Sequence, residues 1–215
     1  CARLRPVASE LLGRTRAPLP EPGLAPHVAR QLLREPGAIV TSTLDADLQL
    51  FAGQALDRQL AHVAGSNVRD GAVVVADIAT GDVLAYVGSG GDASRAAEVD
   101  GVRALRQAGS TLKPFLYSLA IERGYLTAAS LLDDAPVALD TANGLYIPQN
   151  YDRVFRGPVS VRTALGNSLN VPAVRALVLT GVEVFRERLH DVGYADVSRD
   201  GDYYGYSLAL GSAEV

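Results

Sequence analysis

Pro114 constrains the fold of this chain more than any other residue. A proline fits into a helix only near the first turn, where its missing amide N–H has no intrahelical partner to lose. The residues around it carry the apolar stripe of a buried helix: Leu112, Phe115, Leu116, Leu119 and Ala120. A helix therefore begins close to Pro114 and ends at Gly124. Ser110 then lies at or next to the N-terminus of this helix.

Ser110 and Lys113 form a Ser-x-x-Lys motif. Residues three apart share a helix face, so this spacing lets the hydroxyl approach the amine. A serine hydroxyl is a poor nucleophile until a base takes its proton, and a lysine with a lowered pKa can act as that base. A helix N-terminus also favours an oxyanion. We predict that Ser110 is the nucleophile and Lys113 the general base, although an N-cap serine before a solvated lysine has the same spacing.

The identity of the base is supported by the composition of the chain. Of its 20 basic residues, 19 are arginine and one, Lys113, is lysine. Arginine cannot release its proton at physiological pH, whereas a buried lysine can. A single lysine in such an arginine-rich chain is consistent with a role that arginine cannot fill.

A second pair of polar residues, Ser168 and Asn170, interrupts a helical stretch. The helix that Ser160 caps is expected to end near Leu165, and a second helical piece resumes at Val171. A loop at such a break can direct a hydroxyl and an amide into a cleft. We predict that Ser168 shuttles a proton and that Asn170 binds a substrate amide and orients the lysine. Turn formation alone would also explain a serine and an asparagine here.

The rest of the chain predicts a mixture of helices and strands. Helices are expected at 27–34, from Asp45 to about residue 64, and at 182–192. A strand is expected at 39–44, and a hairpin at 72–78 and 83–87 with both faces covered. Residues 125–158 are expected to be irregular, with a tight turn at Asn143-Gly144.

Composition argues against several classes of function. The net charge is −4, with no run of like charge that would indicate nucleic-acid binding. No apolar run reaches the roughly 18 residues that span a bilayer. The single cysteine, Cys1, cannot form an internal disulfide, and the three histidines are scattered. No metal ligand set and no cofactor are therefore predicted.

The ordered motifs resemble a known family. Residues 39–215 are similar to the transpeptidase domain of the bifunctional class A penicillin-binding proteins, and most of all to the penicillin-binding protein 1C subgroup. The resemblance rests on Gly-Ser-Thr-Leu-Lys-Pro-Phe around Ser110, on Asn-Ser-Leu-Asn-Val-Pro-Ala-Val around Ser168, and on Pro-Gln-Asn-Tyr-Asp at 148–152.

This resemblance implies an α+β fold, shared with serine β-lactamases, in which helices flank an antiparallel sheet. It implies a peptidoglycan D,D-transpeptidase that is acylated on Ser110 by D-Ala-D-Ala stem peptides and by β-lactams. Cell-wall synthesis proteins are further expected partners. Residues 1–38 would be the linker from an upstream glycosyltransferase domain, and an N-terminal anchor would hold the parent in the bacterial inner membrane, facing the periplasm.

The chain departs from the family at the third motif, Lys-Thr/Ser-Gly, because its only lysine is Lys113. The C-terminal part of the fold, which carries that motif on a strand beside the active site, is therefore expected to be missing. We predict that these 215 residues alone have little or no activity. A serine β-lactamase and a non-catalytic sensor or scaffold with the same fold remain alternatives.

Overall fold

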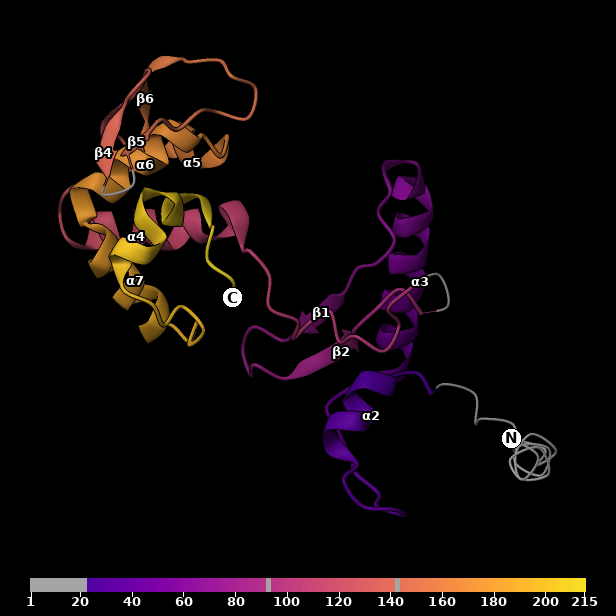
Figure 1. The fold of residues 1–215 in the computed structure, drawn as a ribbon. Coiled ribbons are helices and arrows are strands. Elements are labelled where there is room, and N and C mark those ends of the chain that lie inside the picture. Colours follow the sequence, from indigo (N-terminus) through magenta and orange to yellow (C-terminus); the bar gives the residue numbers. More distant parts are fainter. Residues whose placement is uncertain (1–22, 92–93, 142–143) are drawn as a thin grey trace, which may run out of the picture. The chain divides into compact units, whose positions relative to one another are not determined.

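The computed structural model describes residues 23–91, 94–141 and 144–215, which fall into two compact units divided between Ala104 and Leu105 (Figure 1). The predicted boundary between residues 38 and 39 falls inside the first unit, and the linker role of residues 1–38 stays a prediction. Cys1 and the other residues before Gly23 lie outside the described residues.

The first unit contains helices α2 (Pro26–Leu32) and α3 (Ala46–Val63), the short 3₁₀ helix η1 (Ala64–Ser66), and strands β1 (Val73–Ala76) and β2 (Val83–Val87). Asp45 caps α3 as predicted, because its carboxylate accepts the Leu48 amide at 2.8 Å. Gln49 is buried in α3 and exchanges two hydrogen bonds with the backbone of Tyr86, which fixes α3 against β2.

Two predictions for this unit were wrong. Residues 39–44 do not form a strand, although the Thr43 hydroxyl donates to the carbonyl of Val83, the first residue of β2. The prediction that both faces of the hairpin are covered was also wrong for β1, whereas every side chain of β2 is buried or half-buried. The side chains of β1 alternate between half-buried and exposed, and Val74 is 46 % exposed.

The second unit is built around packed helices. In chain order its elements are η3 (Gly109–Leu112), α4 (Lys113–Glu122), β3 (Leu131–Asp134), β4 (Leu139–Thr141), β5 (Gly144–Tyr146), β6 (Gly157–Ser160), α5 (Val161–Gly166), α6 (Asn170–Thr180), α7 (Val182–Asp191), α8 (Gly201–Tyr204) and η4 (Gly205–Leu210). Helix α4 packs against α6 and α7 around side chains that are essentially inaccessible to solvent: Leu116, Leu119, Val174, Leu177, Phe185 and Leu189. Helix α4, which has Pro114 in its first turn, is thus the central helix of this core.

Antiparallel strand pairs complete the α+β fold, as expected. Within the described residues they form separate two-stranded sheets, β1–β2, β3–β6 and β4–β5. The prediction that residues 125–158 are irregular was wrong for β3 to β6, whose strands have only three or four residues. β3 pairs with β6 across more than 20 residues, and local sequence cannot reveal such a pairing. The predicted turn at Asn143 lies outside the described residues.

Gly211 determines where the segment that carries Ser110 can lie. Its carbonyl accepts the amide of Gly109 at 3.0 Å, and its φ of +71° is in the left-handed region. A Cβ on Gly211 would overlap the backbone oxygen and nitrogen of Gly109. Only a glycine therefore lets η4 approach the start of η3 so closely.

Gly211→Ala should consequently destabilise the second unit strongly. Gly124→Ala is the matched control, because Gly124 also has a left-handed φ, of +72°, but open space where a Cβ would stand. We expect Gly124→Ala to cost about 1–2 kcal/mol through backbone strain alone, and Gly211→Ala to cost about 1–3 kcal/mol more through the clash. Urea unfolding monitored by circular dichroism measures both, and equal losses would contradict the proposed close approach.

Candidate active site

Lys113 is the first residue of α4, and its side chain is fully buried at 0 % exposure. It enters the helix through η3, and its backbone amide donates to the Ser110 carbonyl. Pro114 follows in the first turn, as its fixed φ and missing N–H require. The local sequence thus fixes the start of the helix, and the fold buries the amine.

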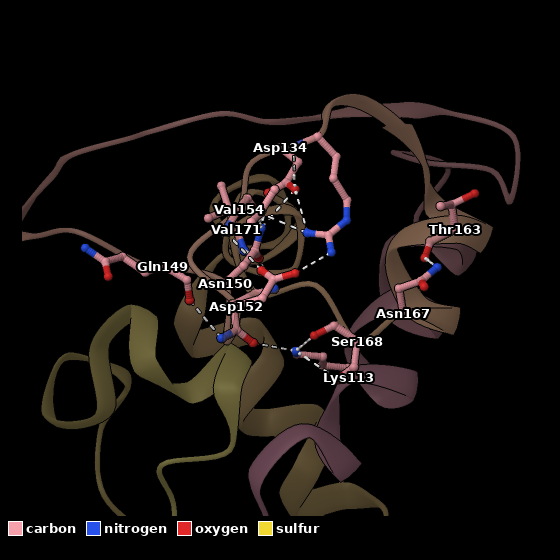
Figure 2. Close-up of polar contacts among 12 residues, drawn as sticks. Lys113, Asp134, Gln149, Asn150, Asp152, Val154, Thr163, Asn167, Ser168 and Val171 are labelled. Carbon is pink, nitrogen blue, oxygen red and sulfur yellow. Dashed lines mark hydrogen bonds and ion pairs between the residues drawn. The ribbon is translucent and has the colours of Figure 1, made fainter.

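The amine of Lys113 is held by three oxygens from the break between α5 and α6. Nζ donates to the Ser168 carbonyl oxygen at 2.6 Å, to the Asn170 side-chain oxygen Oδ1 at 2.7 Å and to the Ser168 hydroxyl at 3.2 Å. Figure 2 shows Lys113 directed at Ser168 with these bonds. The structure therefore brings together three of the four predicted site residues, from segments 55 to 57 positions apart.

Burial lowers the pKa of Lys113 from its ordinary 10.5 to about 8. Among the described residues, no carboxylate forms an ion pair with Nζ that would restore the charged form. The three acceptors are neutral oxygens, whose dipoles only partly replace water. With a pKa of about 8, about a tenth of the lysine is neutral at pH 7, far more than for an ordinary lysine, and the neutral form is the one that a general base requires.

Ser168 has a strained backbone, with a φ of +53° that residues other than glycine rarely adopt. This conformation presents both the carbonyl oxygen and the hydroxyl of the same residue to Lys113. The preceding residue, Asn167, directs its side chain away from the lysine and donates to the Thr163 carbonyl at 2.9 Å (Figure 2).

The chemistry of the three acceptors distinguishes the serine hydroxyl from the others. An ammonium has three protons to donate, whereas a neutral amine has two protons and a lone pair. A carbonyl or amide oxygen can only accept, so neither can turn toward that lone pair. The Ser168 hydroxyl, at 3.2 Å the longest of the three contacts, can rotate and donate. Ser168 is thus the one of these groups that can exchange a proton with Lys113.

Ser110 lies in η3, directly before α4, and is exposed. The described contacts include no hydrogen bond between its hydroxyl and Lys113 Nζ, whose protons are all directed at the α5–α6 break. Catalytic hydrogen bonds are often long before substrate binds. The nucleophilic role of Ser110 stays a prediction.

Two buried residues behind the site were missed as functional candidates. Asn150 belongs to the 148–152 segment, which contributes to the family resemblance but for which the sequence predicted no function. Asp134 is the last residue of β3. A signal for Asp134 was available: it lies two residues after Leu132, so both point to the same buried face of the strand. Asn150 donates to both carboxylate oxygens of Asp134 at 2.8 and 2.9 Å.

Neither a metal site nor a membrane span is found in the part of the chain that the structure describes. No group of three or more histidine, cysteine, aspartate or glutamate side chains there is placed to hold a metal ion. No described helix is both long and apolar enough to cross a membrane.

The lowered pKa of Lys113 can be measured directly, because this is the only lysine in the chain. In protein labelled with ¹³C-lysine, one Cε signal should titrate with a pKa of about 8 in the folded state, and near 10.4 in urea. A folded-state value close to the urea value would contradict the burial of the amine.

The same shift sets a pH dependence of stability. Because the folded pKa lies below the unfolded one, the unfolded chain binds more protons between about pH 8 and 10.5. The contribution of Lys113 to the free energy of unfolding should therefore rise with pH through that window, by about 3 kcal/mol in total. Lys113→Met should lack this contribution when the two proteins are compared by urea unfolding at each pH.

The strain at Ser168 predicts an unusual order of stability for two variants. Both Ser168→Ala and Ser168→Gly remove the hydroxyl, but only glycine adopts a φ of +53° without strain. We expect the glycine variant to be more stable than the alanine variant by about 1 kcal/mol. At Asn167, where φ is −100°, glycine should have no such advantage over alanine. The melting temperatures of the four variants check this, and an alanine variant as stable as glycine at Ser168 would rule out the strain.

Comparison with known proteins connects this arrangement with one family. A family model described as the penicillin binding protein transpeptidase domain matches residues 71–205, which is more than half of the chain. Penicillin-binding protein 1C of Escherichia coli (strain K12) is 37 % identical over 200 residues, which are 92 % of this chain and 25 % of that protein. The chain thus spans about a quarter of the length of this relative.

Solved structures agree with this result. Penicillin-binding protein 1A from Haemophilus influenzae is similar with a TM-score of 0.58 and 31 % identity, over 68 % of this chain and 21 % of that one. The PonA1 protein from Mycobacterium tuberculosis in complex with penicillin V has the same fold, with a TM-score of 0.61 at 24 % identity, over 86 % of this chain and 50 % of that one. The chain therefore belongs to the family of penicillin-binding protein transpeptidase domains, and within it to the class A domains, such as those of penicillin-binding proteins 1A and 1C.

Proposed function

We propose that this domain is the acyl-transfer part of a peptidoglycan D,D-transpeptidase, with Ser110 as nucleophile and Lys113 as general base. The observation that carries the proposal is the buried amine of Lys113, which has a lowered pKa and three bonds to Ser168 and Asn170. Membership of the family supports the same function. The substrate would be the D-Ala-D-Ala end of a stem peptide, on the periplasmic side of the inner membrane.

In the proposed reaction, neutral Lys113 takes the proton of the Ser110 hydroxyl, directly or through one water, as Ser110 Oγ attacks the carbonyl carbon of the penultimate D-Ala. The C–O bond forms while the carbonyl electrons move to its oxygen. The amide bond to the last D-Ala then breaks, and its nitrogen takes a proton from Lys113 through the Ser168 hydroxyl. An ester on Ser110 and free D-Ala result.

The second half of the reaction reverses these roles. The amine of a neighbouring stem peptide attacks the ester and gives up a proton, and Ser110 leaves as its hydroxyl. A new amide bond cross-links the two strands. A β-lactam would enter the same first step, but its ring nitrogen stays attached after the amide bond opens, so the ester persists. Penicillin V, which the PonA1 complex contains, is a ligand of this chemical class.

Labelling by a fluorescent penicillin tests the proposal. We expect the full-length gene product that contains these residues to form a covalent adduct, visible after denaturing electrophoresis, that Ser110→Ala abolishes. Ser118→Ala is the control, since Ser118 is an exposed serine on the same helix whose hydroxyl bonds the Phe115 carbonyl. Its labelling should be unchanged. The 215 residues alone should label weakly or not at all, because they contain no Lys-Thr/Ser-Gly motif.

Each contrary result indicates a different error. Strong labelling of the 215 residues alone would overturn the proposed need for the third motif. Hydrolysis of a chromogenic cephalosporin by the full-length protein would indicate a serine β-lactamase. No labelling of the folded full-length protein would indicate a non-catalytic sensor or scaffold. Labelling that survives Ser110→Ala would place the nucleophile elsewhere.

A further inference from the structure

Asn150 is a buried side chain that the proposed reaction does not use, and all of its polar atoms are engaged. It is 4 % exposed and lies in the irregular segment between β5 and β6. Its amide nitrogen donates to the Asp134 carboxylate and to the Val154 carbonyl, the latter at 2.9 Å. Its side-chain oxygen accepts the backbone amides of Asn170 and Val171, at 2.8 and 3.3 Å. A buried amide with this many partners has one defined position.

The two amides that Asn150 binds belong to the first turn of α6. The first amides of a helix have no intrahelical acceptor, and a side chain at the N-cap commonly supplies one. Here the N-cap residue is Leu169, which cannot. Asn150 supplies the missing acceptor from 20 positions earlier in the chain. The start of α6 is thus capped by a residue outside its own segment.

The same segment also orients the side chain of Asn170. The side-chain nitrogen of Asn170 donates to the Gln149 carbonyl at 2.9 Å, so that its side-chain oxygen faces Lys113 Nζ at 2.7 Å. Gln149 and Asn150 therefore fix the side chain and the backbone of Asn170 respectively. The oxygen that binds the lysine is held at two points by neighbouring residues.

Asp134 determines which way the Asn150 amide faces. Its carboxylate is 0 % exposed, and it accepts the Asn150 amide nitrogen through both oxygens and the Arg156 backbone amide through one, at 3.1 Å. A carboxylate has no proton to donate, so a flipped Asn150 would set its own oxygen against it. The nitrogen must face Asp134, and the oxygen must face α6 (Figure 2).

We propose that Asn150 is a positioning residue of the acyl-transfer site. It holds the Ser168–Asn170 segment in the position in which this segment hydrogen-bonds Lys113, and Asp134 fixes the orientation of the Asn150 amide. This proposal rests on the proposed function for its catalytic meaning. The path runs from the carboxylate through Asn150 and Asn170 to the amine, and each step is a hydrogen bond of 2.7 to 2.9 Å.

A positioning role makes a prediction that a merely structural role does not. Without the Asn150 oxygen the start of α6 would be free to move, and water would reach Lys113. The pKa of Lys113, about 8 in the intact site, would then rise toward 10.5. Each unit of increase would lower the neutral fraction of the lysine at pH 7 about tenfold.

The test compares Asn150→Ala and Asn150→Ser with the unsubstituted protein. Asn167→Ala is the matched control, because Asn167 precedes Ser168 directly but, among the residues that the structure describes, its side chain bonds only the Thr163 carbonyl. The pKa of Lys113 is read from the ¹³C-lysine signal of the folded chain, which requires no activity. The rate of acylation by the fluorescent penicillin is measured against pH on the full-length gene product.

We expect both Asn150 variants to fold and to raise the pKa of Lys113, while Asn167→Ala leaves it unchanged. Acylation at pH 7 should fall by up to about 100-fold in Asn150→Ala, and the deficit should shrink at high pH, where the lysine becomes neutral again. A pKa in folded variants that is unchanged or lower would overturn the proposal. Loss of folding in both variants would also overturn it, since Asn150 would then support the whole unit. Absence of acylation in the unsubstituted protein would refute the proposed function but leave the pKa test valid.

Discussion

The site depends on the three hydrogen bonds that the buried amine of Lys113 donates to neutral oxygens. These bonds join the first residue of α4 to the break between α5 and α6, which the sequence separates by 55 positions. A buried ammonium without a carboxylate partner is costly, so the surrounding dipoles must be held in place. The same cost lowers the pKa of the lysine and makes it suitable as a base. The burial that makes Lys113 suitable as a base therefore also costs the domain stability.

Several departures from ordinary local structure surround these hydrogen bonds. Ser168 has a left-handed φ without being glycine, and the N-terminus of α6 is capped from a distant segment. Gly211 allows two backbone segments to approach closely beside the start of η3. Local sequence preferences alone would select neither the left-handed φ of Ser168 nor the distant cap of α6. The strained Ser168 directly contacts Lys113, and such strain is typical of functional sites, where it persists because the rest of the fold determines it.

The elements that local pattern could reveal were the longer helices and the first hairpin, whereas α8 and η4 were not predicted. Proline at the helix start, the caps at Asp45 and Ser160 and the apolar spacing of α4 act within a few residues, so sequence expresses them directly. The short strands β3 to β6 were not foreseen. The pairing of β3 with β6 joins residues more than 20 positions apart, whereas β4 and β5 form a local hairpin. All four strands have only three or four residues, which carry too little periodicity to identify a strand.

The sequence by itself determined which residues could do chemistry. The Ser-x-x-Lys spacing, the single lysine and the Ser-x-Asn break pointed to Ser110, Lys113, Ser168 and Asn170, because helix geometry and proton affinity follow from residue type and spacing. Only the tertiary structure decided that the lysine is buried, that its protons point to the α5–α6 break, and that Asn150 and Asp134 lie behind it. Burial and long-range hydrogen bonds depend on how distant segments pack, and no local pattern encodes that packing.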